Sequence, residues 1–338
     1  MMAKIVVTNR IHADVRERLE AYGEVVVNAE PEPWPQAELE RLASDAHALM
    51  TFMPDSIGAA ELRAMPELKL LACALKGFDN FDIEACTLRG VWVTIVPDLL
   101  TVPTAELTIG LTIGLARHVM TGDSQVRSGF EGWRPTLYGT GLAGSRVGVL
   151  GIGAIGKAIL QRLAGFEVDA SYWDKAPLSP EDERKLGARF SALEPLLRES
   201  NFVICALPLT PQTLHIMNET AIAQLKPGAF LINPARGSLV DESAVADALE
   251  NGRLAGYAAD VFEMEDWARE DRPRQIEPRL LAMADRTLFT PHLGSAVSSV
   301  RHAIEMEAAR SIIDFLEGRS PRGAVNSPAQ RVGEAETC

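Results

Sequence analysis

The stretch Gly151-Ile152-Gly153-Ala154-Ile155-Gly156 decides the fold of this chain. It follows the apolar run Val147–Leu150, which predicts a buried strand, and it precedes Lys157–Phe166, which predicts an amphipathic helix. A strand, a glycine-rich turn and a helix in this order are typical of the unit that binds the pyrophosphate of a dinucleotide. We therefore expect the cofactor phosphates at the N-terminus of this helix, on the backbone of Gly151, Gly153, Ala154, Ile155 and Gly156.

An acidic residue stands where such a domain contacts the adenosine ribose. The next strand-like run, Val168–Trp173, is followed by Asp174, which lies 18 residues beyond Gly156. A carboxylate there accepts hydrogen bonds from the ribose and repels a 2′-phosphate, so NAD is favoured over NADP. The adjacent Lys175 would tolerate a 2′-phosphate, which leaves NADP as a weaker second cofactor. The alternative is that Asp174 merely begins a turn.

Strand-like and helix-like patterns alternate along most of the chain. They do so from Ile5 to Val96, and again from Val147 to Thr290. Such alternation indicates parallel sheets with helices on both faces. We predict an α/β fold of two doubly wound parallel-sheet domains, in which a Rossmann NAD-binding domain of residues 100–292 is inserted into a flavodoxin-like substrate domain of residues 1–99 and 293–326. The tail, residues 327–338, is rich in Pro, Gly and charge and is expected to be mobile.

The segment Pro103–Met120 predicts a helix that connects the two domains. Proline suits the first turn of a helix, and the segment is apolar on almost every side, which indicates burial. Gly110 and Gly114 would allow the close approach of a neighbouring helix, so we place this segment near a subunit interface. A last helix, Val297–Leu316, is expected to return to the first domain.

The composition excludes several classes of function. The chain has 338 residues, 47% of them hydrophobic, and a formal net charge of −13 at pH 7. That charge argues against nucleic-acid binding and against anchoring on an acidic membrane, but a small anionic substrate needs only a few local cations. The four cysteines are scattered without the spacing of a metal site or a redox pair. We expect no metal, no signal peptide, no membrane contact and a cytoplasmic location.

Three residues that can do chemistry follow predicted strands. Arg236 lies in Asn-Pro-Ala-Arg-Gly, Glu265 in Glu-Met-Glu-Asp, and His292 directly after Phe289-Thr290-Pro291. Open parallel sheets bind ligands where loops leave the strands, so the three side chains are expected at one site. Arg236 can bind an anion, His292 can take up a proton, and Glu265 can fix the tautomer of the histidine. Taken singly, each residue also fits a purely structural role.

Several longer segments resemble a known family. They are Ala74–Asp82, Val96–Glu106, Tyr138–Leu142, Asp260–Ala268, Asp271–Pro273 and Thr290–Ala296. Together with the motifs above they are similar to the D-2-hydroxyacid dehydrogenase family, from about Lys4 to Asn326. The similarity is closer to one branch of that family, the phosphonate (phosphite) dehydrogenases.

The resemblance implies the NAD-dependent oxidation of phosphite to phosphate, with hydride transfer from phosphorus to the nicotinamide and water as nucleophile. Lys76 stands where the wider family has a small or apolar residue, and with Arg236, Gly77 and Met53 it would hold a compact dianion. His292 would deprotonate or orient the water, and Glu265 would position His292. Beyond the glycine turn and Asp174, the implied cofactor contacts are Lys76, Thr104, Leu207, Pro208, Pro234, Ala235, Asp260, His292 and Ser295.

Two alternative functions remain open. A D-2-hydroxyacid dehydrogenase or 2-ketoacid reductase would use the same three residues, with His292 exchanging a proton with the substrate hydroxyl. A corepressor-like protein that senses NAD would need the fold but no catalytic residues. The resemblance also implies a homodimer, which the apolar helix Pro103–Met120 fits.

Overall fold

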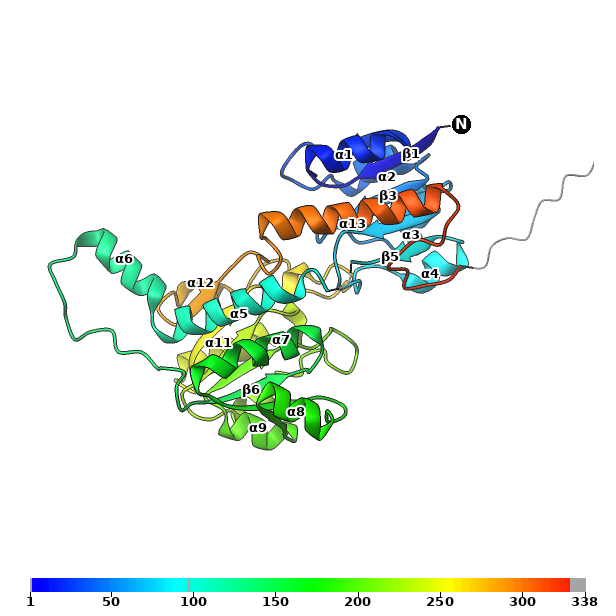
Figure 1. The fold of residues 1–338 in the computed structure, drawn as a ribbon. Coiled ribbons are helices and arrows are strands. Elements are labelled where there is room, and N and C mark those ends of the chain that lie inside the picture. The colour runs from blue at the N-terminus through cyan, green and yellow to red at the C-terminus, as the bar shows by residue number, and fades with distance from the viewer. Residues whose placement is uncertain (1, 97, 329–338) are drawn as a thin grey trace, which may run out of the picture. The chain divides into compact units, whose positions relative to one another are not determined.

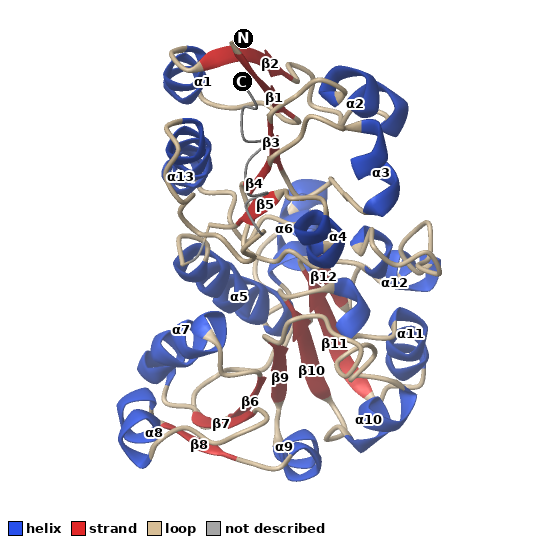
Figure 2. Ribbon diagram, turned by 90° about the vertical axis from the view of Figure 1, so that its right-hand side faces the viewer, coloured by secondary structure: helices blue, strands red, loops and turns tan. Residues whose placement is uncertain are grey.

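The computed structural model describes residues 2–96 and 98–328, and the chain divides into two compact units. Unit 1 contains the residues up to Leu100 and those from Val297 onward, and unit 2 contains Thr101–Ala296. Each unit has its own sheet with helices packed beside it (Figures 1 and 2). Of the tail expected to be mobile, residues 329–338 lie outside the described residues.

The sheet of unit 1 has five parallel strands in the order β2-β1-β3-β4-β5. This is the flavodoxin-like order of a doubly wound sheet, so the prediction for this unit is confirmed. The strands are β1 (Ala3–Val7), β2 (Gly23–Val27), β3 (Ala48–Thr51), β4 (Leu70–Cys73) and β5 (Trp92–Thr94). The helices are α1 (Ala13–Glu20), α2 (Gln36–Ala43), α3 (Ala59–Ala64), α4 (Ile83–Leu88) and α13 (Ser298–Leu316).

The inner strand β1 shows how helices come to cover both faces of this sheet. Val6 packs into a hydrophobic cluster with residues of α2, α3 and α4, whereas its neighbours Ile5 and Val7 pack with residues of α1 and α13. Successive side chains of a strand point to opposite faces, so a continuous apolar run fits a sheet that is buried on both sides. The last helix of the chain thus completes the first unit.

The sheet of unit 2 has seven parallel strands in the order β12-β11-β10-β9-β6-β7-β8. This is the Rossmann order extended by one strand, which confirms the predicted dinucleotide-binding fold. The strands are β6 (Arg146–Leu150), β7 (Asp169–Trp173), β8 (Ala188–Phe190), β9 (Phe202–Cys205), β10 (Ala229–Asn233), β11 (Leu254–Ala259) and β12 (Thr287–Phe289). The sequence pattern did not predict β8, because this edge strand is only three residues long and two of them are exposed.

Two hydrophobic clusters cover the faces of this second sheet. One contains residues of α9, α10 and α11, and the other contains residues of α5, α7 and α8. The helices and short 3₁₀ turns of unit 2 are α5 (Thr101–Ala116), α6 (Val119–Gly129), α7 (Ala154–Leu163), η1 (Ala164–Phe166), α8 (Pro180–Leu186), α9 (Leu193–Glu199), α10 (Glu219–Gln224), η2 (Gly237–Leu239), α11 (Glu242–Glu250), η3 (Glu263–Glu265) and α12 (Pro278–Ala282).

The helix predicted for Pro103–Met120 is in fact two helices. The first, α5, ends at Ala116, and His118 adopts a left-handed conformation (φ 51°) that turns the chain before α6 begins. The apolar residues of α5 pack inside unit 2, because Ile109, Leu111 and Leu115 belong to the cluster that includes α7. Although α5 is apolar all round, no helix in the described part of the chain is long and apolar enough to cross a membrane.

Candidate active site

The predicted residues of unit 2 lie on loops at the carboxyl edge of its sheet. All seven strands are parallel, so the loops that leave β6, β7, β9, β10, β11 and β12 emerge on the same side. The neighbours β6 and β9 mark the point where the strand order reverses, because the chain runs outward from β6 to β7 in one direction and from β9 to β10 in the other. Ligands of open α/β sheets bind at such a switch point.

The glycine turn after β6 has the shape that a pyrophosphate site requires. Gly151 has a φ of +103°, and a Cβ atom at Gly156 would lie 2.0 Å from the carbonyl oxygen of Gly151. Only glycine at position 156 therefore lets α7 start this close to the strand. Gly153 is the N-cap of α7 and supplies no capping side chain, so the first N–H groups of the helix stay open to an anion. The turn fits a dinucleotide phosphate.

Asp174 is anchored to this turn. Its Oδ2 atom accepts a hydrogen bond of 2.7 Å from the backbone N–H of Ile152, and its Oδ1 atom accepts one of 2.6 Å from Lys175. The carboxylate therefore lies beside the glycine turn and keeps a fixed orientation. Two donors do not exhaust the acceptor capacity of a carboxylate, so ribose hydroxyls can still bind there.

His292 and Glu265 form a hydrogen-bonded pair. The Nδ1–H group of His292 donates to Oε2 of Glu265 at 2.7 Å, and about a quarter of each side chain is exposed. The second oxygen of Glu265 accepts the backbone N–H of Phe262 at 2.8 Å, which fixes the carboxylate. His292 itself has a left-handed backbone (φ 56°), an uncommon conformation for a residue other than glycine. Glu265 thus binds Nδ1 of the imidazole, so Nε2 is the nitrogen that can exchange a proton with a substrate.

Asp260 supports the loop that carries His292. Its side chain is buried, and it accepts hydrogen bonds from the hydroxyl of Thr290 (2.5 Å) and from the N–H groups of Leu293 (2.7 Å) and Gly294 (2.8 Å). Burial raises the pKa of Asp260, although these hydrogen bonds oppose the shift. Both carboxylate oxygens thus hold the loop, and the cofactor contact that the resemblance implies for Asp260 stays a prediction.

Arg236 lies on the loop that follows β10, the strand next to β11 in the sheet. Its carbonyl accepts a hydrogen bond of 2.8 Å from the side-chain amide of Asn233, and the same side chain accepts one from the N–H of Ala235. The guanidinium donates through Nη1 to the carbonyl of Ala235 at 2.9 Å, and the side chain is half-buried. A guanidinium has five N–H donors in a planar fork, so this arrangement can hold a carboxylate as well.

The remaining predicted cofactor residues of unit 2 occupy the same edge of the sheet. Leu207 and Pro208 follow β9, and Pro234 and Ala235 follow β10. Ser295 belongs to the His292 loop. Thr104, in the first turn of α5, lies against this loop, because a Cβ atom at Gly294 would be 3.1 Å from its Oγ1. These residues thus belong to loops that follow β9, β10 and β12, and to the helix turn that packs on the last of them.

Three predicted residues belong to unit 1. Met53 follows β3, and Lys76 and Gly77 follow the adjacent β4, so all three lie at the carboxyl edge of that sheet. The Nζ atom of Lys76 lies 3.5 Å from the carboxylate of Asp98. The loop of Met53 is held by buried Asp55, whose carboxylate accepts the N–H of Phe52 at 2.7 Å and the hydroxyl of Thr8.

The structure adds one cation to this edge that the motifs missed. Arg301, in the first turn of α13, places its guanidinium 5.6 Å from the ring centre of Phe52, the residue before Met53. Burial lowers the pKa of Arg301, although Glu305 opposes this. A signal was present, because Arg301 shares one face of α13 with Ile304, Glu305 and Ala308, which are all buried.

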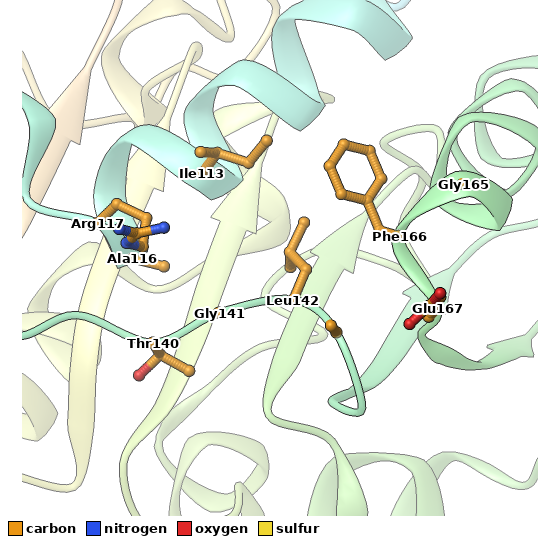
Figure 3. Close-up of a pocket in the computed structure, with 10 residues that line it drawn as sticks. Ile113, Ala116, Arg117, Thr140, Gly141, Leu142, Gly165, Phe166 and Glu167 are labelled. Atoms are coloured by element: carbon orange, nitrogen blue, oxygen red, sulfur yellow. The ribbon is translucent and has the colours of Figure 1, made fainter.

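A separate pocket of about 300 Å³ lies elsewhere in unit 2 (Figure 3). Arg117 and Ile113 of the α5 end line one side, and Phe166 and Glu167 line the other. None of the predicted site residues borders it. It adjoins η1, beyond the C-terminal end of α7, whereas the glycine turn precedes the N-terminal end of that helix. It is therefore distinct from the candidate active site.

Known proteins match this chain over nearly its whole length. Residues 109–294 fit the family model for the NAD-binding domain of D-isomer-specific 2-hydroxyacid dehydrogenases. The glyoxylate reductase of Pyrococcus furiosus is 36% identical and is matched over 98% of both chains. The NADPH-dependent glyoxylate/hydroxypyruvate reductase of Sinorhizobium meliloti, solved with NADP and malonate, is 28% identical with a TM-score of 0.84, over 98% of this chain and 100% of that one.

These relatives overturn the prediction of phosphite oxidation, because similar proteins of full length are named glyoxylate reductases. The prediction relied on Lys76 as an extra cation for a dianion. The proximity of Asp98 offsets that charge, and the spacing of residues in the sequence did not reveal this pairing. The family prediction is confirmed. Because it has a matching NAD-binding domain and is 36% identical to a glyoxylate reductase over 98% of its length, the chain belongs to the D-isomer-specific 2-hydroxyacid dehydrogenase family.

Proposed function

We propose that this protein reduces a small 2-keto acid, with glyoxylate as the first candidate, to the corresponding 2-hydroxy acid. The balanced reaction is 2-keto acid + NADH + H⁺ → 2-hydroxy acid + NAD⁺. The observation that carries the proposal is the 2.7 Å pair of His292 and Glu265 at the carboxyl edge of an NAD-binding domain. The curated relatives named glyoxylate reductases support the choice of substrate.

His292 is the proton donor in this proposal. Glu265 holds Nδ1–H, so Nε2 is the nitrogen that gives its proton to the carbonyl oxygen as the carbonyl carbon is reduced. The carboxylate also stabilises the positive charge of the imidazolium before transfer. Bound NADH would supply the hydride.

Arg236 is proposed to orient the substrate. A 2-keto acid carries one carboxylate beside the carbonyl group that is reduced, and a planar guanidinium can hold that carboxylate with two parallel hydrogen bonds. Arg236 lies on the loop after β10, and Glu265 and His292 lie on the loops after β11 and β12. Three adjacent strands thus present the anion-binding group and the proton donor at one edge.

Asp174 is proposed to favour NADH. Its carboxylate is fixed beside the glycine turn, where its charge opposes a 2′-phosphate. The Sinorhizobium meliloti relative is NADPH-dependent, so the family fold accommodates either cofactor and the local charge decides between them.

The direct test follows NADH absorbance with glyoxylate, hydroxypyruvate and pyruvate as substrates. NADPH serves in parallel, and His292→Ala is the matched control. We expect oxidation of NADH that depends on the keto acid and falls by at least about a thousandfold in the variant. Phosphite with NAD⁺ is included for comparison. NADH binding without turnover of any keto acid would contradict the proposal, as would reduction of NAD⁺ by phosphite alone.

We also propose a homodimer, formed through an arm that comprises α6 and the segment up to Tyr138. No residue of α6 is buried, and Figure 1 shows α6 and the following segment standing apart from the body of unit 2. The arm exposes a run of large apolar side chains: Val119, Met120, Val126, Phe130, Trp133, Leu137 and Tyr138. So many exposed apolar groups indicate an interaction surface. Two copies of the arm can cover each other about a twofold axis.

A further inference from the structure

Unit 2 contains a second histidine–glutamate pair beside the candidate site. The Nε2–H group of His215 donates to Oε2 of Glu263 at 2.7 Å. Glu263 is two residues before Glu265 in the same short turn, η3, so each of these carboxylates receives one histidine. Like His292, His215 has a left-handed backbone, with a φ of 47°. The proposed reaction makes no direct use of His215.

Glu263 is at the centre of a buried polar network. Its side chain is only 9% exposed. Its second oxygen accepts the N–H of Glu242 at 3.2 Å, and its own N–H donates to the Glu242 carboxylate at 2.9 Å. Arg269 approaches Oε2 at 3.3 Å. Burial would raise the pKa of Glu263, but the His215 hydrogen bond and its other partners outweigh burial and lower it. The carboxylate stays charged because its partners remain in place.

The same groups hold the loop of Arg236. Ser238 is two residues beyond Arg236. Its carbonyl accepts the N–H of His215 at 2.8 Å, and its hydroxyl accepts Nη1–H of Arg269 at 2.6 Å. Its own N–H donates to Asp266 at 2.7 Å. His215 therefore bonds to both turns, to η2 through its backbone and to η3 through its imidazole.

The two turns also touch directly. A Cβ atom at Gly237 would lie 1.9 Å from the carbonyl carbon of Phe262, so the Arg236 loop is pressed against the start of η3 without room for a side chain. A small displacement of either turn would therefore move the other. Because Arg236 and Glu265 stand directly beside this contact, their spacing depends on the network that holds it.

We propose that His215 is a positioning residue of the reaction, which through Glu263 and Ser238 fixes the two turns that present Arg236 and Glu265. It does not contact the reacting atoms. Its imidazole joins the β9–α10 loop to η3 through the hydrogen bond to Glu263. This inference rests on the proposed 2-keto acid reduction for its kinetic consequence, whereas its structural consequence is independent of the substrate.

The test compares His215→Ala with His215→Gln. Both variants place a non-glycine residue in the left-handed conformation, but glutamine keeps an N–H donor that can reach Glu263. We expect the alanine variant to lose about tenfold in kcat and to raise KM for glyoxylate, with the affinity for NADH unchanged. Glutamine should restore most of the loss. Glu167→Ala controls for an alanine at an exposed left-handed position (φ 56°).

Hydrogen exchange monitored by mass spectrometry gives a readout without substrate. His215→Ala should speed exchange in 236–239 and 262–266 and leave the glycine turn unchanged. Two results would overturn the inference: unchanged kinetics and exchange in a folded alanine variant, or equal losses in both variants accompanied by weaker NADH binding and a lower Tm. Absence of turnover of every keto acid tested in the wild-type protein would refute the proposed function alone, since the exchange pattern would still test the positioning role.

Discussion

Arg236 and Asp174 each have a charge whose effect can be separated from its packing. Arg236 is half-buried and its backbone is fixed by Asn233, so truncation of its side chain leaves the loop supported. Asp174 bonds to two backbone N–H groups, so an amide at this position can keep the turn while removing the charge. These two positions allow the functional roles to be tested with little disturbance of the fold.

The substrate role of Arg236 predicts a graded loss. Arg236→Ala should lower kcat/KM for glyoxylate by about a hundredfold or more, because a charge-assisted bidentate contact contributes roughly 2–4 kcal/mol. Arg236→Lys should recover only part of this, since an ammonium cannot reproduce the planar fork. Arg198→Ala, at an exposed position of α9, is the control. Steady-state kinetics with fixed NADH would measure the effect, and equal kcat/KM in all proteins would contradict the role.

The cofactor role of Asp174 predicts a shift toward NADPH. Asp174→Asn should raise the NADPH-to-NADH ratio of kcat/KM by about tenfold, because it removes the charge that opposes a 2′-phosphate. Lys175→Ala should move the ratio in the opposite direction, since it removes the adjacent exposed cation. If the NADPH-to-NADH ratio of kcat/KM stayed the same in both variants, neither charge would discriminate between the two cofactors. The measurement is a titration with each cofactor at saturating keto acid.

At the scale of elements, the loop after β3 contains a buried carboxyl group, that of Asp55. Burial raises the pKa of Asp55 to about 6, against an ordinary value of 3.8, although Thr8 and the N–H of Phe52 oppose the shift. The folded state therefore binds a proton more tightly than the unfolded state. The contribution of Asp55 to stability should be greatest at low pH and fall as the pH rises through the interval from about 4 to 6.

Asp55→Asn should remove this dependence. A shift of about two pKa units corresponds to about 3 kcal/mol, so the variant is expected to gain up to that amount of stability at pH 8 and little at pH 4.5. Urea unfolding at the two pH values would measure the difference. Glu17→Gln, at an exposed position of α1, should change neither value. Destabilisation of Asp55→Asn at pH 8 would show that the charged carboxylate is needed by its hydrogen-bond donors.

The elements themselves could largely be predicted from the sequence, and the exceptions have physical causes. Continuous apolar runs such as Leu70–Cys73 and the glycine turn identify buried strands and the cofactor loop without knowledge of their neighbours. The edge strand β8 was missed because it is short and two of its three residues are exposed. The break at His118 was missed because it depends on a left-handed backbone conformation, which the apolar pattern does not report. Lys76 misled the substrate prediction, because its partner Asp98 is 22 residues away and only the folded chain brings them together.

At the scale of the whole molecule, the arm that comprises α6 and the segment up to Tyr138 predicts the assembly state. Val126→Asp and Trp133→Asp should each convert a particle of two chains into one of 36.7 kDa, because a charge in an apolar interface is costly. Leu88→Asp alters a side chain that is 80% exposed in unit 1 and should leave the mass unchanged. Light scattering after size-exclusion chromatography would measure the masses. A wild-type protein of one chain mass would exclude the proposed dimer.

The insertion of unit 2 into unit 1 also sets an order for synthesis on the ribosome. Unit 1 packs α1 and β4 against α13, and α13 begins only at Ser298. While unit 2 is being made, the apolar side chains of β1 and β3 that face α13 have no cover from that helix. Domains tend to fold as they emerge from the ribosome. Unit 2 can therefore complete its fold before α13 is synthesised, whereas the N-terminal part of unit 1 cannot. A nascent chain halted before α13 is therefore expected to aggregate, and the exposed face of the N-terminal sheet is the part that chaperones would need to cover.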